Sequence, residues 1–532
     1  MTALPIVRRE LLVAGRRSWT YWNRCLGALV LLAIGATVAA SSGTSGIARV
    51  AFLLMGSTAL AGALLSGVLL NADRLAAERK AGTLGLLFLT QLTGIDVALG
   101  MLVASTVQGG CALLAMLPVL AIPLMAGGVA FADFWCCALV LVATLLCSAG
   151  IGLWASSRSS DVVPAYSLAI LALAALCLVP ILVSWAARKF GFDFPALATF
   201  ELLSPAVGFN RAINAGAAST GSARAAALSA ISIAGIGVAA VARAGWTLQR
   251  TGRAGLRSRA KPTAMGVDTS GFLSRRSGRR LPARADAAGH YRWLYSARLP
   301  AMRALDIASV LGGIALISFL GVSLTSAGRN HGPFIVAMLI AYGLHVVFKI
   351  RVALAALGPW LEDLSGGGLE LLLTTPLTSD AVRCGHRQAV DSSASHIRWW
   401  LVVANMVVWL VSLHPSTDAT GRGIRTIFGS MYFGGIASLW ADPYCIRNNA
   451  MLLSIKGRRL GQLLARVLLP VVLPPWIAAL AIFILGQTPI PENKLAGWFV
   501  LVQVVQIVWV IVWGNRASRI LGSGFRVLVL SR

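Results

Sequence analysis

The chain has 532 residues, of which 57% are hydrophobic and 12% are charged. Soluble globular proteins carry about 25% charged residues, so the composition excludes that class and indicates an integral membrane protein. The formal net charge of +27 at pH 7 would suit a nucleic-acid-binding protein, but the basic residues lie in short segments between apolar runs, where they act as topology signals.

Apolar runs that can cross about 30 Å of hydrocarbon, each about 20 residues as a helix, recur along the chain. In the first half they lie at 22–42, 47–70, 97–125, 133–156, 162–187 and 224–245. In the second half they lie at 304–325, 333–358, 397–413, 424–441, 463–487 and 495–514. We therefore predict an all-α integral membrane protein with about twelve transmembrane helices. The runs at 397–413 and 424–441 are barely long enough, which leaves the count open by one or two.

The basic residues predict the orientation of these spans. With both termini in the cytoplasm, only nine of the 46 basic residues fall in outer segments. These are Arg49, Arg188, Lys189, Arg211, Arg224, Arg329, Arg422, Arg425 and Lys494. Such an excess of inner positive charge is what the positive-inside rule expects. Tryptophans near the span ends suit an aromatic belt, namely Trp22, Trp154, Trp185, Trp246, Trp440 and Trp513.

The segment ERKAGTLGLLFLTQLTG (78–94) is an apolar stretch between charged residues, too short to cross a bilayer. From Thr83 to Leu92 a helix would measure about 15 Å, half the bilayer thickness. Thr83 can act as its N-cap, and Thr93 and Asp96 have the spacing of a capping box that starts the third span. We predict a short interfacial helix whose apolar side lies under the spans and whose Glu78 end is exposed.

The segment 246–300 contains no span and is rich in Arg, Gly and Ser. We predict a first six-span half at 1–248, a basic, disordered cytoplasmic linker at 249–290 and a second six-span half at 291–532. Contact of this polybasic linker with lipid headgroups is an alternative to a plain linker.

The two halves show an internal repeat. GTLGLLFLTQLTGIDV (82–97) aligns without gaps on GGLELLLTTPLTSDAV (367–382) with eight identities in 16 positions, and Thr93 aligns with Thr378. Leu153-Trp154-Ala155 matches Leu439-Trp440-Ala441 at an offset of 286 residues, against 285 for the first match. Two matches at nearly one offset indicate duplication. Because each half has an even number of spans, the halves are predicted to be parallel repeats with a pathway between them.

Several kinds of chemistry are disfavoured by the residues. None of the nineteen carboxylates lies in the middle of a predicted span, whereas carriers driven by ions usually need such groups. His345 is the one titratable residue that we place well inside a run, and we interpret it as an interhelical hydrogen-bonding residue rather than a proton relay. No lysine follows a glycine, so the chain has no P-loop and no ATPase site of that type. We predict no catalytic, cofactor or metal site.

At this point the motifs resemble a known family. The pattern E-x-x-x-G-T-L-x-L-L, with T-P-L in the second copy, is similar to the permease subunits of ABC transporters of the exporter-type superfamily. In the first copy it comprises Glu78, Arg79, Gly82, Thr83 and Leu84, and in the second copy Asp363, Gly367, Glu370, Thr375 and Pro376. The first copy departs from the pattern at Gly85 and Gln91, and the second at Gly368.

The resemblance extends to the chain's start and to one outer segment. PIVRRELLVAGRRSWTYWNR, with Arg9, Glu10 and Leu11, resembles the family's lead-in helix, and 292–305 would be its second copy. LSPAVGFNRAINA (203–215) is similar to the external re-entrant region before the sixth span. The resemblance implies a permease of an ATP-driven exporter in a bacterial plasma membrane. ATP would be bound and hydrolysed by separate P-loop ATPase subunits that dock on the coupling elements.

Two other functions stay open. A twelve-span secondary carrier of the major facilitator kind also has two parallel halves, and Asp73-Arg74 with Arg79-Lys80 partly matches its loop motif but lacks the glycines. A membrane scaffold or sensor without transport is the third possibility. The substrate, the direction of transport, the identity of the ATPase and whether one chain or a dimer forms the pathway do not follow from the sequence.

Overall fold

The computed structural model shows a helical protein. It describes residues 4–16, 18–40, 47–80, 93–159, 161–189, 191, 195–216, 221–259, 287–299, 302–325, 332–375, 377–412, 419–455, 460–485 and 492–530. All regular elements within these ranges are α-helices, which confirms the predicted all-α class. Seven helices in them are long and apolar enough to cross a membrane, which supports assignment as a membrane protein. The total of twelve spans stays a prediction.

The chain divides into two compact units, Met1–Ala264 and Met265–Arg532. The first contains α1 Leu4–Gly15, α2 Ser18–Ala40, α3 Ile47–Asn71, α4 Arg74–Lys80, α6 Gly94–Leu120, α7 Ile122–Met125, α8 Phe131–Arg158, α9 Val162–Lys189, α10 Pro195–Glu201, α11 Pro205–Ala212 and α12 Gly221–Arg259. The second contains α14 Ala287–Arg298, α15 Arg303–Thr325, α16 Gly332–Ser365, α17 Gly368–Thr374, α18 Ser379–Ser412, α19 Ala419–Ser454, α20 Leu460–Leu485 and α21 Glu492–Leu530.

Helices extend into both ends of the predicted linker. Helix α12 continues to Arg259, so the first residues of the segment 249–290 are helical, and α14 begins within it at Ala287. The rest of that segment, 260–286, lies outside the described residues. Arginine is a good helix former and tolerates exposure, so the basic composition did not prevent the helix from continuing.

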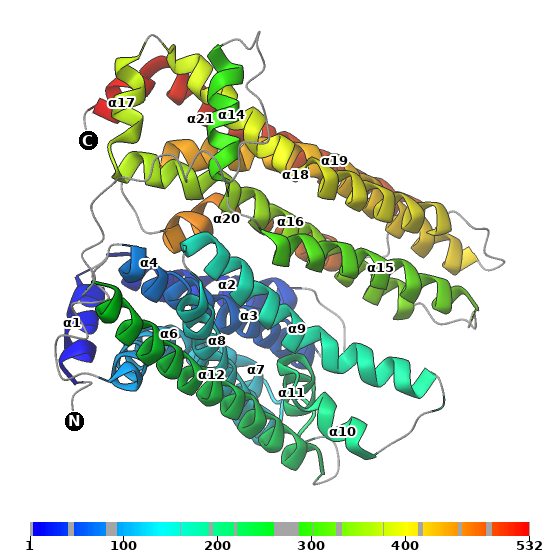
Figure 1. Ribbon diagram of the computed structural model, residues 1–532. Helices are drawn as coiled ribbons and strands as arrows, with labels where there is room; N and C mark the ends of the chain where they lie inside the picture. The colour runs from blue at the N-terminus through cyan, green and yellow to red at the C-terminus, as the bar shows by residue number, and fades with distance from the viewer. Residues whose placement is uncertain are drawn as a thin grey trace. The chain divides into compact units, whose positions relative to one another are not determined.

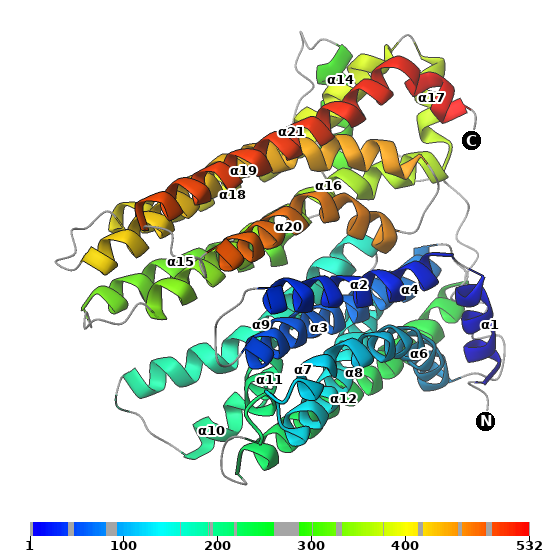
Figure 2. The ribbon, with the colours of Figure 1, turned by 180° about the vertical axis from the view of Figure 1, so that it is seen from behind.

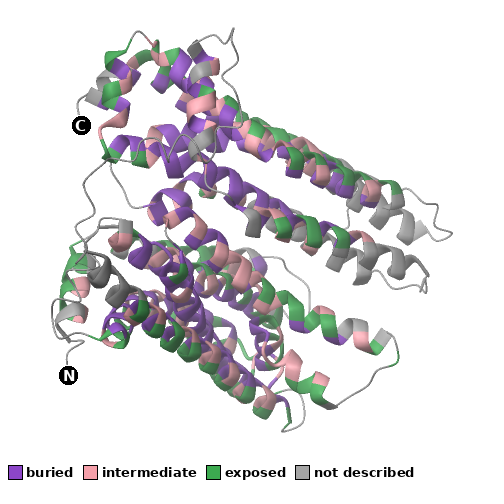
Figure 3. Cartoon of the chain, in the orientation of Figure 1, coloured by how far each residue is buried: buried purple, intermediate pink, exposed green. Residues whose placement is uncertain are grey.

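Helix α8 lies at the centre of the first unit (Figures 1 and 2). It packs against α3, α6, α9, α11 and α12, and most of its length is buried (Figure 3). Small residues make these close contacts possible: a Cβ added to Gly150 would lie 2.4 Å from the carbonyl oxygen of Gly237, and one on Gly67 would lie 2.0 Å from Ser148 Oγ. Close backbone approach through glycine and serine is typical of helix packing in membranes, where no hydrophobic force brings helices together.

Helix α19 has the corresponding place in the second unit, where it packs against α16, α18, α20 and α21 (Figure 1). Helices α18 and α19 have 34 and 36 residues, about 50 Å each, and are much longer than the runs at 397–413 and 424–441. Their added turns carry serine, arginine and aspartate. The apolar runs are therefore shorter than the helices. Only residues that face lipid on all sides must be apolar, so a helix can continue with polar residues beyond such a run.

Candidate functional site

The residues predicted as a lead-in helix, Arg9, Glu10 and Leu11, lie in the separate helix α1, which packs against α6 and contacts the first residue of α4. The carboxylate of Glu10 accepts a hydrogen bond from Arg74 Nη1 at 3.0 Å, and both side chains are largely buried. Arg9 pairs with Glu10 at 2.8 Å on the exposed side, and Leu11 is half-buried. Because Arg74 is the first residue of α4, this ion pair joins α1 to the helix that leads into the first coupling element.

Helix α4 is joined to the end of α8. Ser156 Oγ accepts hydrogen bonds from the backbone N–H groups of Leu75 and Ala76, both at 3.0 Å, and so satisfies donors of the first turn. In return, the guanidinium of Arg79 donates to the carbonyl oxygens of Ser157 and Ser159, at 2.8 and 3.0 Å, which have no helical partner at a C-terminus. Any displacement of α4 would therefore be passed directly to the most buried helix of the unit.

This geometry corrects one expectation. The Glu78–Lys80 end of the predicted interfacial helix was expected to be exposed to a partner, but Glu78 and Arg79 lie in α4 and are half-buried. Both terminal nitrogens of the Arg79 guanidinium already donate hydrogen bonds to α8, which leaves fewer donors for a partner protein. Gly82, Thr83 and Leu84 lie outside the described residues.

The capping box predicted after the first coupling element is present. Thr93 Oγ1 accepts from Asp96 N at 3.2 Å, and the carboxylate of Asp96 accepts from Thr93 N at 3.0 Å, at the start of α6. In the second copy, the aligned Thr378 Oγ1 accepts from Ala381 N at 3.2 Å at the start of α18. Both threonines thus cap the start of a long helix.

The residues predicted as the second coupling element lie in and around the short helix α17. Gly367 has a φ of +71°, which only glycine adopts easily, and this residue separates α17 from α16. Leu369 and Leu373 are buried, one turn apart, whereas Glu370 and Thr375 are exposed. Leu371 is 70% exposed on the outward side. Of the other predicted residues, Asp363 is buried at the end of α16, and Pro376 lies outside the described residues.

A buried ion pair in the second unit was missed in the sequence. Lys349 Nζ of α16 lies 2.9 Å from Asp442 Oδ2 of α19, and the side chains are only 4% and 2% exposed. The sequence analysis placed no ionisable group but His345 well inside a run, and that was wrong, because Lys349 lies in the run at 333–358. Asp442 directly follows the run at 424–441 and so lay just outside the predicted span. Two basic residues in an apolar run, Lys349 and Arg351, were the signal that could have indicated buried ion pairs.

Next to this pair, His345 makes interhelical hydrogen bonds, as predicted. Its Nε2 lies 3.3 Å from Asn405 Oδ1 of α18, and its Nδ1 lies 3.5 Å from Ser438 Oγ of α19. Since Ser438 and Asp442 are one turn apart on α19, and His345 and Lys349 are one turn apart on α16, the four side chains form one continuous polar strip in the helix interface.

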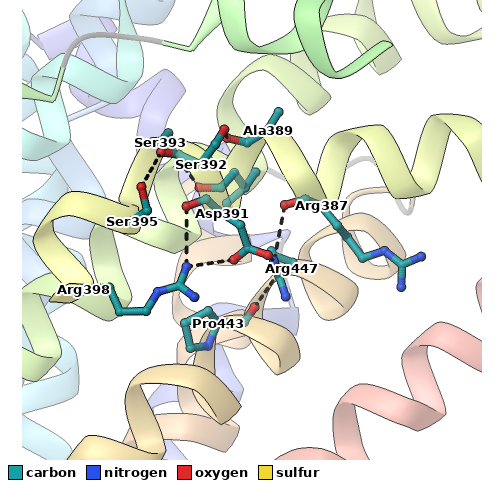
Figure 4. Close-up of polar contacts among 10 residues, drawn as sticks. Arg387, Ala389, Asp391, Ser392, Ser393, Ser395, Arg398, Pro443 and Arg447 are labelled. Atoms are coloured by element: carbon teal, nitrogen blue, oxygen red, sulfur yellow. Dashed lines mark hydrogen bonds and ion pairs between the residues drawn. The ribbon is translucent and has the colours of Figure 1, made fainter. Parts of the chain in front are cut away.

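Further ion pairs follow along α18 and α19. Asp391 lies between two arginines, Arg398 at 3.0 Å and Arg447, and Arg447 also donates to the carbonyl oxygens of Arg387 and Pro443 (Figure 4). Burial, and then the charge of Arg387, lowers the pKa of Arg447 to about 10, so it remains charged at neutral pH. These contacts satisfy buried charges and rigidify the polar ends of the two helices.

A third arginine, Arg351 of α16, pairs with Asp306 of α15 and donates to the carbonyl oxygen of Ser393 at 2.8 Å. No group of three or more His, Cys, Asp or Glu side chains in the described ranges could hold a metal ion. The charged side chains of this unit therefore form pairs rather than a ligand cage.

Comparison with known proteins adds no relative to this description. No protein-family model matches the chain, and no curated protein is similar to it in sequence. The class that the helices define is that of a polytopic membrane protein, and its function rests on the arrangement of its own residues.

Proposed function

We propose that the chain is the membrane-spanning permease of an ATP-driven exporter of the ABC type, coupled to separate P-loop ATPase subunits. The observation that carries the proposal is the surface of α17. Leu371 is 70% exposed on this short helix, and the neighbouring Glu370 is also exposed. The buried side chains of Leu369 and Leu373 hold the helix in place. Protein interfaces commonly place apolar side chains inside a polar rim, and Leu371 beside Glu370, on a short helix outside the predicted spans, fits such a docking contact.

Two further features support a duplicated coupling machine. Helices α8 and α19, which carry the two copies of Leu-Trp-Ala, pack against corresponding neighbours: α3, α6, α9 and α12 in one case and α16, α18, α20 and α21 in the other. The aligned threonines at 93 and 378 both cap the helix after the coupling element. Two coupling elements in one chain would serve two ATPase subunits, with the pathway between the fused halves.

The contacts of α4 suggest how a signal would travel in the first half. Movement of the coupling element would act on α4, which hydrogen-bonds α8 through Ser156 and Arg79. Ser157 of α8 in turn accepts a hydrogen bond from Thr247 Oγ1 of α12 at 2.9 Å. The chain of contacts α4–α8–α12 thus connects an inner-surface element to two spans.

A copurification experiment tests docking directly. The tagged chain is expressed together with any P-loop ATPase that a neighbouring reading frame encodes, and the ATPase is quantified in the purified membrane complex. Leu371→Arg is expected to reduce recovery at least tenfold, because a central apolar anchor is worth about 2 kcal/mol or more. Gln388→Arg, which adds the same charge at an exposed site of α18, is the matched control and should leave recovery unchanged. Equal recovery with Leu371→Arg and wild type would refute docking at α17.

One observation favours the second candidate, a secondary carrier. Lys349 and Asp442 supply the buried ionisable groups that such a carrier needs and that the sequence analysis did not find. Deletion of the ATPase gene separates the two functions. If the chain is a permease of the ABC type, export that depends on this chain should stop; if it is a secondary carrier, that export should continue. For the carrier, the phenotype should instead be lost in Lys349→Met/Asp442→Asn, which removes both ionisable groups without leaving an unpaired buried charge.

A further inference from the structure

Helix α12 carries two arginines without acidic partners at one end of its membrane-facing side. Arg243 and Arg250 lie on either side of Trp246, with their guanidinium carbons 4.6 and 4.0 Å from the centre of its ring. All three side chains are exposed. In the part of the chain that the structure describes, neither guanidinium forms an ion pair with a carboxylate, and both stack on the indole of Trp246.

The position of the three residues along α12 corresponds to the membrane interface. The apolar stretch that could cross a bilayer is Gly221–Arg250, and Ile231 and Val238, 67% and 58% exposed, mark its outward face. Trp246 follows Val238 by eight residues, on the same side of the helix. The opposite side, with Ala244 and Leu248, is buried against α4, α6 and α8. The apolar outer face therefore ends in an interfacial tryptophan flanked by two cations.

The chemistry of this arrangement fits a phosphate group at the membrane surface. Cation–π stacking uses the flat face of a guanidinium, whereas its N–H donors lie in the plane and stay available for phosphate oxygens. Arg243, one turn before Trp246, can extend towards the headgroups while its aliphatic part covers apolar surface. Two uncompensated positive charges would repel the ammonium of a zwitterionic headgroup and favour a headgroup with net negative charge.

We propose that Arg243, Trp246 and Arg250 form a binding site for the headgroup of an anionic phospholipid in the leaflet at this end of α12. The site does not depend on docking of an ATPase. A basic residue near an anionic membrane surface contributes about 1 kcal/mol, which corresponds to about a fivefold change in affinity. Loss of both arginines should therefore weaken binding by about 25-fold.

Native mass spectrometry of the purified chain, titrated with phosphatidylglycerol or phosphatidylcholine, measures this affinity. The wild type should bind phosphatidylglycerol more tightly, and Arg243→Gln/Arg250→Gln should lose that preference. The matched control is Arg211→Gln/Arg224→Gln, which removes two exposed charges from α11 and the other end of α12 in the same unit. It should keep most of the preference. All variants alter exposed side chains, so their thermal stability should stay close to wild type, which a melting curve checks.

Three outcomes would overturn the proposal. The first is a wild type that does not discriminate between the two lipids. The second is a double variant at 243 and 250 whose affinity for phosphatidylglycerol lies within twofold of wild type. In the third, inorganic phosphate displaces phosphatidylglycerol, which would assign the site to a free anion instead of a lipid.

Discussion

The buried pair of Lys349 and Asp442 makes a strong prediction about stability. Its side chains are 4% and 2% exposed, so replacement of one partner leaves the other as an unpaired charge inside the bundle. Removing one partner of a buried pair costs about 3–5 kcal/mol, whereas replacing both with uncharged residues of similar size is often nearly neutral. We therefore expect Lys349→Met and Asp442→Asn each to destabilise strongly and the double variant to recover most of the loss.

The magnitude can be converted to a melting shift. For a unit of this size, 1 kcal/mol corresponds to about 2–4 °C, so each single variant should melt on the order of 10 °C below wild type. The double variant should lie within about 4 °C of it. Scanning fluorimetry at one fixed heating rate in detergent is the assay, because unfolding of such proteins is commonly irreversible. The coupling of the two substitutions then gives the interaction energy.

The reasoning would be refuted by additive effects. If the double variant lost as much stability as both single variants together, the two charges would not compensate each other in the bundle. Single variants that melt within about 2 °C of wild type would show that water reaches at least one of the two groups. Exposed Arg516→Met in α21 serves as the control for loss of a surface charge and should change the melting temperature little.

Two further predictions concern packing and pH. Gly150→Ala should lower the melting temperature by several degrees, because its new Cβ meets the Gly237 carbonyl at 2.4 Å, whereas Gly235→Ala has no heavy atom within 4 Å and should be neutral in the same melting assay. His386, in the part of α18 before the predicted span, has a pKa lowered to about 3, first by burial and then by the charges of Arg447 and Arg387. The unfolded chain binds this proton below about pH 6.5 and the folded chain does not, so stability should fall by about 2 kcal/mol from pH 7 to 5. Melting curves across this range should show that His386→Phe removes that part of the decline; an unchanged slope would contradict it.

The sequence predicted those features that depend on a few neighbouring residues. The capping box of Thr93 and Asp96 depends on groups three residues apart, and the hydropathy runs depend on one helix in contact with lipid. The separate helix α1 and the short helix α17 are also set by local residues, because a charged segment follows α1 and Gly367 interrupts the chain before α17.

The structure decided what depends on residues far apart in the chain. Lys349 and Asp442 are separated by more than ninety positions, and nothing local to either shows that two apolar helices bring their charges together. The same is true of Arg79, which was expected to face a partner and instead satisfies the carbonyl groups at the end of α8. The sequence by itself determined the membrane class and the start of individual helices, since these follow from transfer into hydrocarbon and from backbone capping. Only the tertiary structure decided which charges are buried, because burial is a property of the packed helices and not of any one segment.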